Sequence, residues 1–79
     1  MTSIFVAKLD FGVTSEQLKS AFQEYGTVLK ATVATDRETG KSRGFGFVEM
    51  VLAHEGEIAI NELHGSKVGK NKIRIKQLV

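Results

Sequence analysis

The sequence contains no cysteine, and its only histidines are His54 and His64. Disulfide bonds and thiolate metal sites are therefore excluded. The two histidines also lack the ligand spacing of a recognisable metal site, so we expect neither a metal nor another cofactor. No apolar run reaches the roughly 18 residues that a transmembrane helix needs, so we expect no membrane partner. Residues 1–4 show neither a basic n-region nor an apolar h-region, so no signal peptide is expected.

The chain is long enough for one small domain, which we expect to span residues 1–79. Of its 79 residues, 42% are hydrophobic and 25% are charged, which is ordinary for a soluble globular domain. The net charge of +2 only weakly favours an anionic partner. The distribution of charge is more informative, because residues 66–79 hold five cations and no acid, whereas residues 53–64 hold three acids and no Lys or Arg. The pattern predicts one basic and one acidic side.

Hydrophobic periodicity predicts the element order β-α-β-β-α-β. Strands are expected at residues 4–9, 28–35, 44–50 and 72–77. Helices are expected at residues 15–25 and 55–63. Thr14 and Gln17 are placed to form a capping box at the start of the first helix, whereas no capping residue stands before the second. The order is typical of the ferredoxin-like α+β fold, a four-stranded antiparallel sheet with two helices on one face.

A sheet that is covered on one side leaves its other face in water. In the first strand, alternation separates Ile4 and Val6 from Phe5. In the third strand, it places Phe45 and Phe47 together. Because the helices supply matching aliphatic residues, we expect the aliphatic set to be buried and the three phenylalanines to be exposed. Reversed faces, or a one-residue slip in register, would exchange the two sets and remain an alternative.

Three exposed aromatic rings beside cations match the chemistry of a single-stranded nucleic acid. Bases stack on phenyl rings with about 1–3 kcal/mol per base, and phosphates bind Lys and Arg. Arg43 stands two residues before Phe45, at the entrance to the third strand. The pattern therefore favours a single-stranded nucleic acid over a protein helix as the partner of this face.

At these residues the sequence resembles the RNA recognition motif family, over nearly the whole chain. Residues 43–50, Arg-Gly-Phe-Gly-Phe-Val-Glu-Met, match the RNP1 octapeptide of that family at seven positions. Residues 4–9 are similar to its RNP2 hexapeptide. Met50 departs from the RNP1 pattern and is expected to point inward. In the last hairpin Gly69 comes one place earlier than usual, so we expect Lys70 or Asn71 to adopt a positive φ.

The resemblance implies a role for each matching residue. Phe5 and Phe47 would each stack on a base, Phe45 would pack against sugars, and Arg43 would contact a phosphate. The other residues that it implies in RNA binding are Lys8, Glu49, Arg74, Lys76 and Gln77. Similarity to small stand-alone bacterial members further implies a cytoplasmic protein that acts in post-transcriptional RNA regulation or protection, and we expect a monomer.

Two other binding functions remain open. Val51, Leu52 and Ala53 are apolar where the family is usually acidic and polar, so this stretch is either an ordinary turn or a contact surface. A protein partner that binds Val51, Leu52 and the second helix is therefore an alternative to RNA. Single-stranded DNA is another, because stacking alone does not sense the 2′-hydroxyl.

An enzyme is not expected, because no nucleophile stands with a base and an orienting group in a recognisable motif. Residues 44–49 lack the third glycine of a dinucleotide-binding loop. Residues 36–40 match a calcium loop only in part, since the glycine is misplaced and the bidentate Glu is missing. His54 and His64 are expected to be surface residues at the two ends of the second helix.

Overall fold

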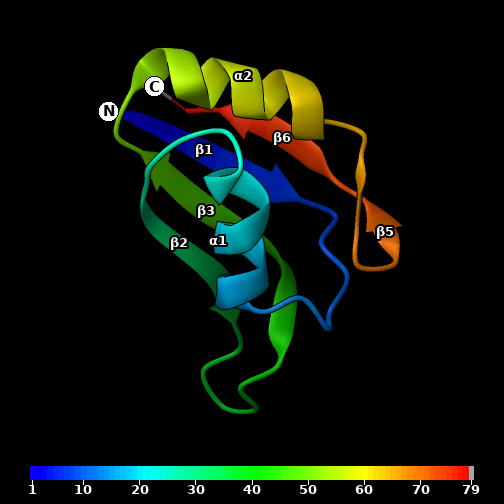
Figure 1. Cartoon of the computed structure of the whole chain (residues 1–79). Helices are drawn as coiled ribbons and strands as arrows, with labels where there is room; N and C mark the ends of the chain where they lie inside the picture. Colours follow the sequence, from blue (N-terminus) through cyan, green and yellow to red (C-terminus); the bar gives the residue numbers. More distant parts are fainter. Residues whose placement is uncertain (79) are drawn as a thin grey trace.

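The computed structural model describes residues 1–78, which form a four-stranded sheet, two helices and a small hairpin. The elements in chain order are β1 (Thr2–Ala7), α1 (Ser15–Gln23), β2 (Val28–Thr35), β3 (Ser42–Met50), α2 (Ala53–Leu63), β4 (Lys67–Val68), β5 (Asn71–Lys72) and β6 (Arg74–Gln77). The main sheet is antiparallel and has the strand order β2-β3-β1-β6. Both helices lie on the same side of it (Figure 1). The expected ferredoxin-like α+β arrangement is therefore confirmed.

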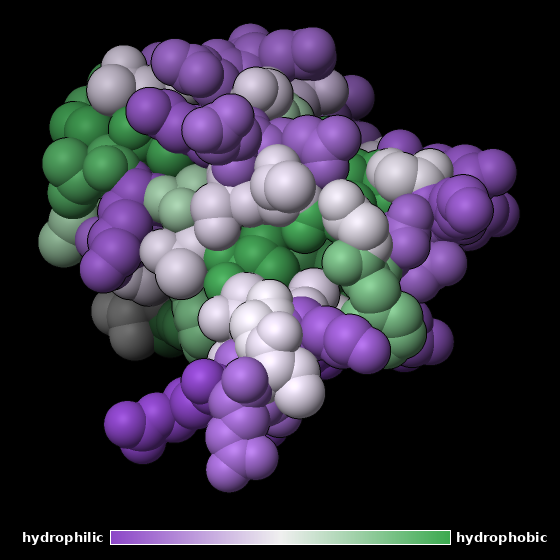
Figure 2. Space-filling model, turned by 90° about the horizontal axis from the view of Figure 1, so that it is seen from below, coloured by the Kyte–Doolittle hydropathy of each residue, from purple (hydrophilic) through white to green (hydrophobic). Residues whose placement is uncertain are grey.

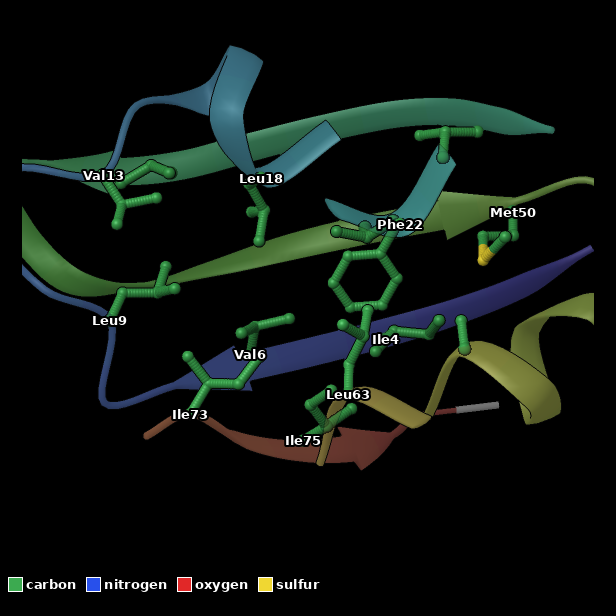
Figure 3. Close-up of a cluster of buried hydrophobic side chains, with 14 residues drawn as sticks. Ile4, Val6, Leu9, Val13, Leu18, Phe22, Met50, Leu63, Ile73 and Ile75 are labelled. Atoms are coloured by element: carbon green, nitrogen blue, oxygen red, sulfur yellow. The ribbon is translucent and has the colours of Figure 1, made fainter. Parts of the chain in front are cut away.

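The core fills the space between the helices and one face of the sheet. Ile4, Val6 and Met50 are fully buried, and Val48 is 1% exposed. Phe22 on α1 points down into this cluster, toward Ile4 (Figure 3). The aliphatic side of β1 and β3 therefore faces the helices. The alternative with reversed faces is wrong, because it would place these four residues in water.

Helix α1 begins at Ser15, as predicted, whereas α2 begins at Ala53, two residues before its predicted start. The Thr14 hydroxyl accepts a hydrogen bond from the Gln17 N–H at 3.2 Å, and the Gln17 side-chain oxygen accepts one from the Thr14 N–H at 3.0 Å. This reciprocal pair confirms the capping box before α1. Helix α2 begins at Ala53, and its N-cap residue Leu52 makes no side-chain capping bond. The start of α2 therefore depends on packing rather than on a cap.

The strand that was predicted at residues 72–77 is divided. Lys72 pairs with β4 in the separate hairpin, and β6 begins only at Arg74. Alternation of Lys, Ile and Arg through this region made the two pieces look continuous. The division lets the chain leave the hairpin and join the edge of the main sheet beside β1 (Figure 1).

The turn of the β4–β5 hairpin corrects a second expectation. Gly69 has a φ of 69°, whereas Lys70 and Asn71 are not among the described residues with a positive φ. Val68 pairs with Asn71, so Gly69 and Lys70 are the two central residues of the turn. A two-residue hairpin turn with a positive φ at its first central position favours glycine there. The glycine therefore stands where the turn requires it, and the predicted strain at Lys70 or Asn71 was wrong.

Candidate nucleic-acid interface

Phe5, Phe45 and Phe47 lie together on the face of the sheet that the helices leave open. Phe5 on β1 is directly opposite Phe47 on β3, and Ala7 is opposite Phe45. The ring centroids are 5.4 Å apart for Phe5 and Phe47, 5.7 Å for Phe5 and Phe45, and 6.0 Å for Phe45 and Phe47. Phe47 is 43% exposed, and the other two rings are partly buried. We call these three rings the aromatic platform.

Gly46 keeps the two platform rings of β3 on the outer face. A β-carbon at residue 46 would lie 2.6 Å from the Thr32 carbonyl oxygen and 3.0 Å from Leu18 Cδ2 on α1. Only glycine fits this crowded position between β2 and α1. With residue 46 directed toward the helices, alternation directs Phe45 and Phe47 away from them.

Cations flank the platform on both sides. The Arg43 guanidinium lies 5.3 Å from the centroid of the Phe45 ring, a cation–π arrangement that holds the charge beside the aromatic surface. On the opposite flank, β6 places Lys76 opposite Phe5 and Arg74 opposite Ala7. All three cations are exposed. A polyanion that crosses the rings would therefore meet positive charge on either side.

The β2 side of the platform is more mixed in charge. Lys30 is opposite Glu49, and Thr32 is opposite Phe47. These four residues line a shallow hollow of about 270 Å³. Glu49 was expected on or beside this surface, and the structure places it there. Lys30 and Thr32 were missed, because an irregularity in the register between Val28 and Lys30 interrupts the alternation of β2.

Two residues of the expected site are not part of the aromatic platform. Gln77 is paired with Ile4, so its side chain is on the helix-covered side, where its Nε2 donates a hydrogen bond to the Thr2 hydroxyl at 2.9 Å. Lys8 follows the end of β1 and has a φ of 59°, which turns the chain away from the sheet. It lines a separate cleft together with Arg43. The platform therefore includes neither side chain, and Lys8 lies beside it.

His64 connects the end of α2 to β6. It is exposed, as expected, but its Nδ1 accepts a hydrogen bond from the Ile75 N–H at 2.9 Å. Ile75 lies between the two cations of β6, Arg74 and Lys76, so this bond helps to hold the strand that presents them. Sequence reasoning had no signal for the contact, because the bond joins two elements that periodicity treats separately.

Asp36 orders the loop that leads into β3. Its Oδ1 accepts hydrogen bonds from the N–H groups of Glu38 at 2.8 Å and Thr39 at 3.1 Å. The bonds from Thr39 and Glu38 lower the pKa of Asp36 below its ordinary value, and the nearby charge of Arg43 lowers it further. The charged form of this carboxyl group therefore stabilises the loop that precedes Arg43.

The apolar turn before α2 is open to solvent. Val51 is 40% exposed and Leu52 is 47% exposed, and Ile58 on α2 is also 47% exposed. The Val51 N–H donates to the Thr27 carbonyl at 3.1 Å, which fixes the turn against the chain that enters β2. The surface that would serve a protein partner is therefore separate from the aromatic platform.

Residues 1–78 contain neither a cluster of metal ligands nor a helix that could span a membrane. No three His, Cys, Asp or Glu side chains in this part of the chain come together as metal ligands would. No helix in it has the length and apolar character that crossing a bilayer requires.

Comparison with known proteins identifies relatives of this chain in plants and bacteria. Glycine-rich RNA-binding protein 4, mitochondrial, from Arabidopsis thaliana is 42% identical over 74 residues, which are 94% of this chain and 54% of that protein. The putative RNA-binding protein RbpA from Nostoc is 49% identical over 65 residues, which are 82% of this chain and 64% of that protein. The chain thus spans between 54% and 64% of the length of these two relatives.

The solved structures give the same result for the fold. The crystal structure of RNA binding protein PG1 superposes with a TM-score of 0.95 and 42% sequence identity, and covers 100% of this chain and 95% of that one. Residues 4–74, which include the platform and both helices, match the family described as the RNA recognition motif. This chain belongs to the RNA recognition motif family.

Proposed function

We propose that this domain binds single-stranded RNA on the aromatic platform. The observation that carries the proposal is the set of three phenylalanine rings, with centroids 5.4–6.0 Å apart, on an uncovered sheet face between two groups of cations. Such rings stack on bases and exclude water from them. Membership in the family and the RNA-binding relatives support the same function.

The proposed roles follow from the position of each side chain. Phe5 and Phe47 stack on one base each, because they lie on adjacent strands and face outward. Phe45 packs against the sugars between those bases. Phosphates bind the flanking cations Arg43, Arg74 and Lys76, and Glu49 with Lys30 contacts the edge of the base above Phe47. Unpaired bases are required, since the faces of paired bases are hidden within a helix.

All platform residues come from one chain, so a second copy is not needed to complete the surface. We propose a monomer that acts on cytoplasmic RNA, in its regulation after transcription or in its protection. Sedimentation of the protein with and without RNA tests the first part. A monomer that forms a complex with one RNA oligomer is expected, and a dimer in the absence of RNA would contradict the proposal.

The central test is a binding titration with a fluorescently labelled RNA oligomer of mixed sequence. Phe47→Ala is expected to weaken binding by about 5- to 150-fold, which corresponds to about 1–3 kcal/mol for one lost base stack. Ile58→Ala on α2 is the matched control, because the two side chains are 43% and 47% exposed but lie on opposite sides of the sheet. Equal binding by Phe47→Ala and wild type would show that the platform is not the RNA site.

Because Val51 and Leu52 are exposed, binding of a protein partner is the second candidate function. Amide chemical shifts separate the two surfaces. RNA is expected to shift resonances of β1 and β3, whereas a protein that binds the turn and α2 would shift those of residues 51–63 and leave the platform unchanged. A DNA oligomer of the same sequence provides the third comparison, and equal affinity for both would contradict selectivity for RNA.

A further inference from the structure

Phe11 is an exposed aromatic residue that the platform does not include. It lies in the loop between β1 and α1 and is 73% exposed, more than any other large hydrophobic residue in the described chain. Its ring lies against Gly44, where a β-carbon would be only 3.2 Å from Phe11 Cε1. An apolar side chain held this far into water is typical of a surface that another molecule covers. Figure 2 shows the molecule from below, with apolar surface near the centre of the view and hydrophilic side chains around it.

Four cations line the same cleft as this ring. A cleft of about 530 Å³ is lined by Phe11 and by Lys8, Arg43, Lys70 and Lys72, and no acidic residue lines it. The cleft is wide open to solvent, so a ligand would lie along it rather than be enclosed. It combines a surface for an aromatic ring with positive charge for an anion.

Asp10 fixes the two sides of the cleft to each other. Its Oδ1 accepts a hydrogen bond from the Gly12 N–H at 3.2 Å, and its Oδ2 accepts one from the Lys70 N–H at 3.1 Å. The bonds hold the loop that carries Phe11 against the hairpin that carries Lys70 and Lys72. A site that is formed before its ligand arrives loses less entropy when it binds.

Arg43 connects the cleft to the platform. Its guanidinium is 5.3 Å from the centroid of Phe45, and the same side chain lines the cleft. The Leu9 N–H donates to the Gly44 carbonyl at 2.9 Å, so the chain segments beneath the two surfaces are joined directly. A nucleic-acid strand that leaves the platform at Phe45 would therefore pass Arg43 and reach Phe11.

We propose that this cleft binds one additional nucleotide of the same RNA strand, with its base on Phe11 and its phosphate between Lys8, Lys70 and Lys72. The inference rests on the proposed function and extends it beyond the sheet. A nucleotide provides the ring and the anion together, which an apolar or acidic protein segment does only in part. The RNA footprint is then longer than the two or three bases that the sheet alone holds.

The test compares a trinucleotide, which spans the platform, with hexanucleotides that extend it at the 5′ or the 3′ end. Phe11→Ala is expected to leave trinucleotide affinity unchanged and to weaken binding of one hexanucleotide by about 5-fold or more. Phe47→Ala is expected to weaken both lengths. Leu29→Ala is the control for loss of an exposed apolar side chain, because Leu29 is 59% exposed and does not line the cleft.

A second variant provides a direct signal from the site. The chain contains no tryptophan, so Phe11→Trp introduces a single fluorophore into the cleft. Its fluorescence is expected to be quenched by the hexanucleotide that reaches the cleft and to remain unchanged with the trinucleotide. The variant also retains an aromatic ring, so it should bind the hexanucleotide as wild type does.

The outcomes separate the two proposals. If wild type binds neither RNA length, the proposed function fails and this inference fails with it. If Phe47→Ala weakens binding but Phe11→Ala equals wild type on both hexanucleotides, only the cleft proposal is overturned. Absence of quenching in Phe11→Trp with either hexanucleotide would overturn it as well.

Discussion

Thr2 on β1 occupies the space that Gly56 leaves open on α2. A β-carbon at residue 56 would collide with Thr2 Cγ2, and Thr2 itself is 1% exposed. The Thr2 hydroxyl also accepts the hydrogen bond from Gln77 Nε2. One side chain thus joins β1, α2 and β6, and the glycine that weakens α2 locally allows the helix to approach the sheet.

We predict that Gly56→Ala destabilises the protein by about 1–3 kcal/mol through overpacking. Helix propensity alone predicts the opposite sign, because alanine is favoured over glycine by about 1 kcal/mol inside a helix. Urea denaturation measures the free energy of unfolding. Thr2→Ser removes Cγ2 and keeps the hydroxyl, so the double variant should recover most of the loss. A Gly56→Ala protein as stable as wild type would contradict the packing explanation.

The bond between His64 Nδ1 and the Ile75 N–H provides a second stability prediction. His64→Ala removes the acceptor and leaves a partly buried N–H, which should lower the free energy of unfolding by about 0.5–1.5 kcal/mol. His54→Ala, at the exposed start of α2, is the control and should change stability much less. Similar losses in the two variants would mean that the bond does not contribute.

The lowered pKa of Asp36 predicts how the β2–β3 loop responds to acid. The charged carboxylate accepts the bonds from Thr39 and Glu38, so its contribution is complete above the ordinary pKa of 3.8 and is lost as the pH falls through the lowered value. The amide resonances of Glu38 and Thr39 should therefore titrate with a midpoint below 3.8. Asp36→Asn, which does not ionise there, should abolish this titration. A midpoint at the ordinary value would contradict the assignment.

Salt dependence tests the cations of β6. Binding of single-stranded RNA should weaken as salt rises, because each neutralised phosphate releases counterions. Lys76→Gln or Arg74→Gln should each reduce the slope of log K against log salt by about 0.7. Lys19→Gln on α1 is the control, since Lys19 is exposed on the helical side. If Lys19→Gln changes the slope as much as Lys76→Gln does, the RNA phosphates do not lie beside the cations of β6.

Periodicity predicted the features of this domain that depend on near neighbours along the chain. The alternation of Phe5 with Ile4 and Val6, and the run from Arg43 to Met50, were enough to identify the open face. The capping box of Thr14 and Gln17 was likewise predictable, because its partners are three residues apart. Such features can be predicted because all the residues that determine them lie within one strand or one helical turn.

Contacts between distant loops could not be predicted in this way. The Asp10–Lys70 bond joins residues 60 positions apart, and the Thr2–Gln77 bond joins residues 75 positions apart. Neither pair follows a repeating pattern, so the sequence did not predict the cleft around Phe11. The exposure of Phe11 could not be predicted either, because Leu9 and Val13 in the same connector are apolar and buried.

The separation of Phe5 and Phe47 has a consequence for the RNA itself. Their centroids are 5.4 Å apart, and the rings lie beside one another on neighbouring strands. Two bases that stack on these rings therefore also lie beside one another, so an RNA that uses both rings must give up the stacking between those two bases. Folding of the target therefore competes with binding. Stretches with little tendency to stack or form hairpins should be occupied first, whatever their base identity.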